Sequence, residues 1–184
     1  FAEPLAAAVG ILGLTPIAPI DRVVVIGPGK LGNLVAQVLA LTGADLLVVG
    51  RRAGPLEWLA RRGIRTGLLD AIEPRRADVV VECSGNPAGF ALARQAVRPR
   101  GTIVLKSTYT GDTTVNLSSI VVDEVRLVGS RCGPMDAALR LLEQAAVDLT
   151  PLIACRYPLD RIVDALAEAD QPGRMKVLVQ MPRN

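Results

Sequence analysis

The sequence of 184 residues contains no histidine, and only five of its residues are aromatic. Without histidine the chain can form neither a Ser-His-Asp triad nor a Cys-His pair, and it offers zinc no imidazole ligand. No apolar run approaches the roughly 20 residues that span a bilayer. These absences exclude several hydrolytic and metal-dependent mechanisms, and they predict a globular domain with no membrane partner.

Charge and sulfur content exclude further classes of protein. The net charge of +3 comes mostly from arginine, because the chain has only three lysines. Nucleic-acid surfaces usually combine basic side chains with aromatic ones, so the scarcity of aromatic residues argues against a nucleic-acid partner. The chain has three cysteines, Cys83, Cys132 and Cys155, and no two of them have C-x-x-C spacing. The odd number and the spacing argue against a disulfide framework and against a zinc knuckle, and they predict a cytoplasmic location.

Short β-branched runs alternate with segments of helical periodicity along the chain. Runs such as 22–26 and 78–83 are largely apolar, as in strands that are buried on both faces of a sheet. The pattern predicts strands at 22–26, 46–49, 64–69, 78–83, 102–105 and 125–128, a closing strand at 176–180, and helices at 30–41, 56–62, 87–97, 135–146 and 158–169. We therefore expect an α/β fold with a doubly wound, six-stranded parallel sheet in three α/β/α layers.

The first 20 residues fall outside this alternation. Residues 2–14 are rich in Ala and Leu and predict a helix, and residues 15–20 form a Pro-rich link. The sequence therefore predicts a linking segment at 1–20 and a nucleotide-binding domain at 21–184.

A glycine-rich loop with the pattern G-x-G-x-x-G follows the first predicted strand and opens a predicted helix. In that context the first glycine permits a tight turn, the second lets a pyrophosphate approach the backbone, and the third lets the helix pack against the strand. The helix N-terminus offers unpaired N–H groups to the anion. The alternative is an ordinary strand-to-helix turn. The predicted cofactor contacts in this loop are Gly27, Gly29, Lys30, Leu31 and Gly32.

The end of the second predicted strand indicates which dinucleotide binds. An NAD site has Asp or Glu there to accept the ribose hydroxyls, but this chain has Gly50, Arg51 and Arg52. Guanidinium groups bind a 2′-phosphate in a bidentate manner, so we predict that NADP is preferred and that NAD is the weaker cofactor. The alternative is that both arginines stack on adenine or are only solvated.

Several segments together resemble the cofactor domain of the medium-chain dehydrogenase/reductase superfamily, the zinc-dependent alcohol dehydrogenase group. Besides the glycine-rich loop, the resemblance rests on the order and spacing of Ala2–Ala6 (A-E-P-L-A), Val80–Gly85 (V-V-E-C-S-G), Gly101–Leu105, Val128–Ser130 and Pro172–Leu178. It covers nearly the whole chain and implies a Rossmann fold.

The resemblance also implies an oxidoreductase that transfers hydride between a nicotinamide and an alcohol or carbonyl carbon, with zinc polarising the substrate oxygen. In that family the zinc ligands belong to a catalytic domain that precedes this region, so the chain is expected to be the nucleotide-binding part of a larger dehydrogenase, inactive alone and without metal. Glu3 matches a glutamate that lies near zinc in some polyol dehydrogenases. Two interpretations of Glu3 stay open: a zinc ligand, in the intact enzyme only, and an ordinary acid at a helix start that interacts with the helix dipole.

Further cofactor contacts are expected at the carboxyl ends of the later strands, where ligands of open parallel sheets bind. They are Cys83, Ser84 and Gly85 after the fourth strand, Lys106, Ser107 and Thr108 after the fifth, and Lys176 near the pyrophosphate. Lys106 follows four apolar residues. Three interpretations of it stay open: a phosphate contact, a partner of Glu82, and a solvated loop lysine.

The family's usual assembly predicts a homodimer through the sheet edge near Val115–Leu117, where an unpaired strand would otherwise be exposed. Two alternatives to the dehydrogenase remain: a non-catalytic NAD(P)-binding module with a redox-sensing or regulatory role, and another Rossmann enzyme such as a methyltransferase. The arginines at 51–52 argue weakly against the methyltransferase, because an adenosine ribose without a 2′-phosphate favours an acidic partner.

Overall fold

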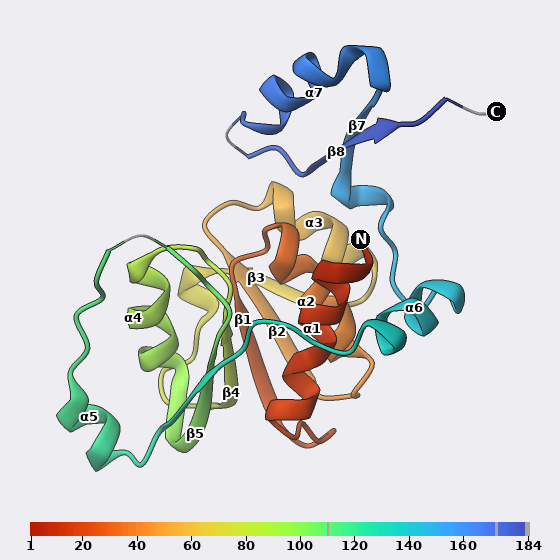
Figure 1. Cartoon of the computed structure of the whole chain (residues 1–184). Coiled ribbons are helices and arrows are strands. Elements are labelled where there is room, and N and C mark those ends of the chain that lie inside the picture. Colours follow the sequence, from red (N-terminus) through yellow and green to blue (C-terminus); the bar gives the residue numbers. More distant parts are fainter. Residues whose placement is uncertain (110, 172, 183–184) are drawn as a thin grey trace. The chain divides into compact units, whose positions relative to one another are not determined.

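The computed structural model describes residues 1–109, 111–171 and 173–182 (Figure 1). Residues 1–147 and 148–184 form two compact units, and each is described by itself. Pro172, the first residue of one of the segments that carry the family resemblance, lies outside the described residues. The predicted boundary between a linking segment at 1–20 and a nucleotide-binding domain at 21–184 is a functional division. It stays a prediction.

A six-stranded sheet forms the centre of the first unit. Its strands are β1 (Arg22–Ile26), β2 (Asp45–Gly50), β3 (Arg65–Leu68), β4 (Ala77–Glu82), β5 (Val97–Leu105) and β6 (Arg126–Gly129). They lie in the order β3-β2-β1-β4-β5-β6, and every neighbouring pair is parallel. The chain order reverses between β1 and β4, which is where doubly wound sheets bind ligands. The predicted fold is confirmed.

Helices cover the sheet, mostly close to their predicted positions. They are α1 (Ala2–Leu14), α2 (Lys30–Ala40), α3 (Gly54–Arg61), α4 (Pro87–Ala96), α5 (Leu117–Val122) and α6 (Met135–Glu143). The pattern did not predict α5, which is one and a half turns long. Its signal is Asn116, whose side chain accepts a hydrogen bond from the Ser119 N–H in the manner of an N-cap.

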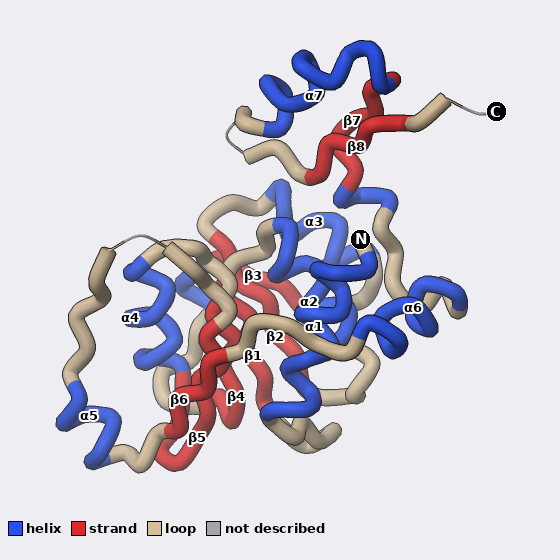
Figure 2. The backbone as a smooth tube through the Cα atoms, viewed as in Figure 1, coloured by secondary structure: helices blue, strands red, loops and turns tan. Residues whose placement is uncertain are grey.

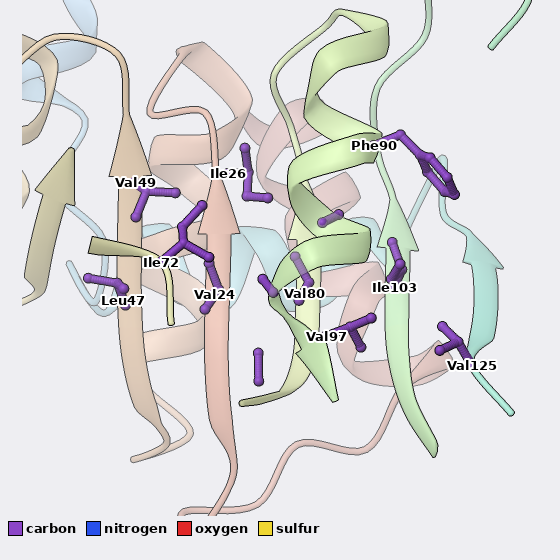
Figure 3. Close-up of a cluster of buried hydrophobic side chains, with 13 residues drawn as sticks. Val24, Ile26, Leu47, Val49, Ile72, Val80, Phe90, Val97, Ile103 and Val125 are labelled. Atoms are coloured by element: carbon purple, nitrogen blue, oxygen red, sulfur yellow. The ribbon is translucent and has the colours of Figure 1, made fainter. Parts of the chain in front are cut away.

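The strand interiors bury side chains on both faces of the sheet. On one face, Val24 and Ile26 of β1 belong to a cluster with Phe90 of α4 and Ile103 of β5 (Figure 3). The intervening Val25 is fully buried as well and, by the two-residue period of a strand, points to the opposite face. Burial of each such side chain contributes about 1.5–3 kcal/mol to the free energy of folding. For this reason apolar residues in these strands do not alternate with polar ones.

Helix α1 packs on the rest of the first unit through backbone contacts. It contacts α2 and α6, and it lies against the segment that leads from β6 to α6. A Cβ on Gly10 would come within 2.2 Å of the Cys132 carbonyl oxygen, and one on Gly133 within 1.8 Å of the Ala6 carbonyl oxygen. Any larger residue at either glycine would push the helix away from this segment.

The second unit is a small α/β arrangement of its own. It contains β7 (Ile153–Pro158), α7 (Ile162–Ala169) and β8 (Lys176–Gln180), and β7 pairs with β8 in parallel (Figure 2). The predicted strand at 176–180 is present, but it pairs with β7 instead of closing the large sheet. The sequence interpretation missed β7, although its alternation of half-buried and exposed residues is typical of a two-stranded surface sheet.

An ion-pair network joins the turn before β4, helix α4 and the turn after α5 at the amino edge of the six-stranded sheet. The guanidinium of Arg75 donates two hydrogen bonds to the Asp123 carboxylate, at 2.7 and 3.0 Å. Arg94 of α4 binds the same carboxylate and also donates to the Ser119 carbonyl oxygen at 2.9 Å. The hydrogen bonds from Arg75 and Arg94 lower the pKa of Asp123 to about 2.

We expect Asp123→Asn to lower the melting temperature at neutral pH by a few degrees, because the variant leaves two guanidiniums without their shared partner. The folded pKa lies below the ordinary value, so the contribution of this carboxylate is present above about pH 4 and is lost as the pH falls through about 2. Thermal melts followed by circular dichroism should therefore show wild type and variant converging in acid. Asp136→Asn, which removes an exposed pair within α6, is the matched control and should change little.

Candidate functional site

Two loops meet at the point where the strand order reverses. Gly27, directly after β1, has φ +98°, which only glycine adopts readily. A Cβ there would lie 2.8 Å from the Cα of Ser84, in the loop after β4. A Cβ on Gly32 would lie 1.9 Å from the Gly27 carbonyl oxygen. The first and third glycines of the pattern therefore bring loop, helix and neighbouring strand end into backbone contact, as predicted for a phosphate-binding loop.

The second glycine of the pattern borders open space. Gly29 is the N-cap of α2, and a Cβ built on it meets nothing within 4 Å. The first-turn N–H groups of a helix have no partner within the helix, and they carry its positive dipole end. A pyrophosphate fits this cradle, with exposed Lys30 and half-buried Leu31 beside it.

The end of β2 presents the two arginines that were predicted to select NADP. Gly50 packs on the loop, since a Cβ there would lie 2.8 Å from the Pro28 ring. Arg51 and Arg52 follow and are both exposed. Within the described part of the chain, no salt bridge involves either guanidinium. Ten other arginines do form salt bridges: Arg61, Arg65, Arg75, Arg76, Arg94, Arg98, Arg100, Arg140, Arg161 and Arg174.

A buried carboxylate supports the loop after β4. Glu82 is 2% exposed, and its Oε1 accepts the Ser84 N–H at 2.7 Å. Gly89 of α4 leaves room for it, because a Cβ there would come 2.3 Å from Oε1. Sequence reasoning did not assign Glu82 a role of its own, although an acid that ends a run of valines is the signal that could have found it.

Cys83, the first residue of the loop after β4, is a protonated thiol at neutral pH. Burial, followed by the nearby Glu82 carboxylate, raises the pKa of Cys83 to about 12. A thiol with such a pKa is neither a nucleophile nor a ready metal ligand. Its expected contribution to the site is therefore packing, in agreement with the half-buried position of the residue.

The loop after β5 is tied to the loop after β4. Ser107 Oγ accepts the Gly85 N–H at 2.8 Å, and the Lys106 N–H donates to the Glu82 carbonyl oxygen at 3.0 Å. Thr108 is exposed. The predicted contacts at 83–85 and 106–108 thus lie on neighbouring loops, beside the glycine-rich loop.

The side chain of Lys106 follows none of the three interpretations drawn from the sequence. It is only 7% exposed, and its ammonium donates to the carbonyl oxygens of Ala7 and Arg131 at 2.9 and 3.1 Å and to Ser130 Oγ at 3.2 Å. A lysine ammonium has three N–H donors, and these acceptors use them all. Lys106 is therefore neither solvated nor paired with the Glu82 carboxylate, and its ammonium has no N–H left for a phosphate.

Two predicted residues, Glu3 and Lys176, belong to other segments of the chain. Glu3 is exposed in the first turn of α1. Among residues 1–109, 111–171 and 173–182, no group of three or more Cys, Asp and Glu side chains could hold a metal ion. Lys176 begins β8 in the second unit and is half-buried. No helix in the described ranges is long and apolar enough to cross a membrane.

Comparison with known proteins identifies relatives for most of the chain. A family model described as zinc-binding dehydrogenase matches residues 30–146. The 2-dehydro-3-deoxy-L-galactonate 5-dehydrogenase of Pseudoalteromonas atlantica is 29% identical over 192 residues, which cover 97% of this chain and 56% of the relative. The chain thus spans little more than half the length of this relative.

Solved structures show the same likeness. A protein of Sinorhizobium meliloti 1021, assigned to the zinc-binding dehydrogenases and solved bound to NADP, superposes with a TM-score of 0.86 at 26% identity, over 97% of this chain and 58% of that one. Alcohol dehydrogenase TADH from Thermus sp. ATN1 superposes with a TM-score of 0.87 at 25% identity, over 99% of this chain and 57% of that one.

The sequence resemblance is confirmed, since the family model covers more than half of the chain and the fold agrees along its length. The chain belongs to the zinc-binding dehydrogenase family and corresponds to the nucleotide-binding domain of the medium-chain dehydrogenase/reductase superfamily.

Proposed function

We propose that this chain is the cofactor-binding part of a zinc-type alcohol or polyol dehydrogenase and that it binds NADP(H). The observation that carries the proposal is the glycine-rich loop, in which Gly27 and Gly32 are in tight backbone contact while Gly29 borders open space at the N-terminus of α2. Such a loop binds a pyrophosphate through backbone N–H groups. The NADP bound to the Sinorhizobium meliloti relative supports the same assignment.

The bound dinucleotide would supply or accept a hydride at its nicotinamide, with an alcohol or carbonyl carbon as the other centre. The role of this chain's own residues is to bind the dinucleotide and to orient it. The N-terminus of α2 holds the pyrophosphate, and the loops at 83–85 and 106–108, joined through Ser107 and Gly85, border the place for the nicotinamide half. The metal and the group that takes the alcohol proton belong to another part of the enzyme, since the described residues hold no cluster of metal ligands.

We further propose that NADP is preferred over NAD. A carboxylate at the end of β2 would repel a 2′-phosphate, and this chain has Gly50 there instead. Arg51 and Arg52 follow on the surface and form no salt bridge within the described part of the chain, so they can bind a phosphate without breaking an existing ion pair.

Replacement of both arginines, Arg51→Gln with Arg52→Gln, should weaken NADPH binding about tenfold or more and leave NADH binding nearly unchanged. The reason is that a charge-assisted hydrogen bond to the 2′-phosphate contributes about 1.5–3 kcal/mol. Isothermal titration calorimetry on both nucleotides measures this. Arg61→Gln, which removes an exposed arginine of α3, is the matched control. Wild-type binding of NADH as tight as that of NADPH would contradict the preference.

We expect this chain alone to bind NADP(H) without oxidising alcohols or polyols. It has no histidine, and its described residues hold no metal-ligand cluster. The assay follows formation of the reduced nicotinamide by absorbance, with and without added zinc, on a preparation whose nucleotide binding has been verified. Sustained turnover of any alcohol would disprove this expectation.

We also propose a homodimer, but not through residues 115–117. That segment is loop and the start of α5, whereas β6 is an edge strand of the sheet and carries exposed Leu127. Val121 and Val122, at the end of α5 shortly before β6, are exposed as well. Light scattering should show a dimer that Leu127→Lys shifts toward monomer, because a charge on an edge strand opposes pairing. Leu41→Lys, at an exposed position after α2, should leave the mass unchanged. A wild-type monomer at high concentration would count against the dimer.

A further inference from the structure

Gly50, the last residue of β2, faces the ring of Pro28 at a distance that leaves no room for a side chain. Gly50 lies in a strand and its φ is not positive, so the backbone conformation at this position suits any residue. A Cβ there would come 2.8 Å from both Cγ and Cδ of Pro28. Non-bonded carbon atoms favour separations of about 3.5–4.0 Å, so any side chain at position 50 requires the ring to move.

The Pro28 ring has little freedom to move aside. Pro28 is buried, and Gly27 before it donates its N–H to the Val49 carbonyl oxygen at 2.9 Å. Gly27 is held as closely toward β4, since a Cβ on it would lie 2.8 Å from the Cα of Ser84. The start of the glycine-rich loop is therefore fixed between the ends of β2 and β4. Because its ring is closed onto the backbone, Pro28 cannot rotate away from Gly50.

The end of β2 is also where a dinucleotide-binding sheet recognises the adenosine ribose. In NAD sites a carboxylate at this strand end accepts hydrogen bonds from the ribose hydroxyls. An aspartate or glutamate in place of Gly50 would have to place its Cβ against the Pro28 ring. The chain therefore has no room for such a carboxylate while Pro28 is present.

We propose that Pro28 is a specificity-determining residue, which keeps this chain selective for NADP(H) because it prevents an acidic residue at position 50. The inference rests on the proposed NADP(H) function. Arg51 and Arg52 attract the 2′-phosphate, whereas Pro28 excludes the acid that would favour NAD and repel that phosphate. Cofactor choice thus depends on the pair Pro28 and Gly50, and the two positions can change only together.

Substitutions at positions 28 and 50 should accordingly be non-additive, as expected for residues in contact. Pro28→Ala removes Cγ and Cδ, the two ring atoms nearest to a Cβ at position 50. Gly50→Asp alone should lower the melting temperature by several degrees and should not improve the affinity for NADH. In the double variant the aspartate has room to accept the ribose hydroxyls. That variant should bind NADH about tenfold more tightly than Pro28→Ala does, and NADPH about tenfold more weakly.

The test combines thermal melts with calorimetric titrations of NADH and NADPH on the wild type, both single variants and the double variant. Gly54→Asp is the matched control, because it adds the same carboxylate at an exposed glycine on which a Cβ meets nothing within 4 Å. This control should melt like the wild type. The melts measure the steric conflict, and the titrations measure the choice of cofactor.

A Gly50→Asp protein that melts like the wild type and gains as much affinity for NADH as the double variant would overturn the proposal. If Gly50→Asp does not fold, the double variant decides. Folding with a gain in affinity for NADH supports the role of Pro28, and failure to fold, or folding without that gain, contradicts it. Failure of both the wild type and Pro28→Ala to bind either nucleotide would instead disprove the proposed function itself, whatever the melts show of the contact.

Discussion

The arrangement of the site depends on the close approach of backbone to backbone at the glycine-rich loop. Gly27 faces the loop after β4, and Gly32 faces the carbonyl of Gly27, at separations that leave no room for a methyl group. This contact sets how near α2 comes to β1, and with it the direction in which the first-turn N–H groups point. Burial on both faces of the sheet stabilises the strands, but the glycines decide how closely the ends of β1 and β4 approach the N-terminus of α2.

Much of the fold could be predicted from the sequence because its signals are local. The strands of the main sheet are short apolar runs, α2 shows helical periodicity, and the glycine pattern lies between the two. The pairing of β7 with β8 could not be predicted in the same way, since partner choice depends on contacts distant in sequence. The short helix α5 relies on its Asn116 cap more than on periodicity, so a period-based interpretation overlooks it.

The candidate site was predictable where residue type and spacing determine backbone geometry, as in the loop glycines, whereas the role of Arg51 and Arg52 stays a prediction. It was not predictable where the role comes from burial. Lys106 could be interpreted from the sequence as a solvated lysine, a phosphate ligand or a partner of Glu82, and the fold instead places acceptors from residues 7, 130 and 131 around its ammonium. Those acceptors come from segments about 100 and 25 positions away along the chain, and no local sequence pattern indicates them.

The raised pKa of Cys83 determines how the loop after β4 responds to oxidants. Peroxides attack thiolates far faster than thiols, and a thiol with a pKa of about 12 is almost entirely protonated in any cellular compartment. The Cys83 sulfur atom, in the loop after β4, is thereby shielded from sulfenic acid formation by its own surroundings. A thiol side chain can thus lie beside the glycine-rich loop without turning that loop into a redox sensor.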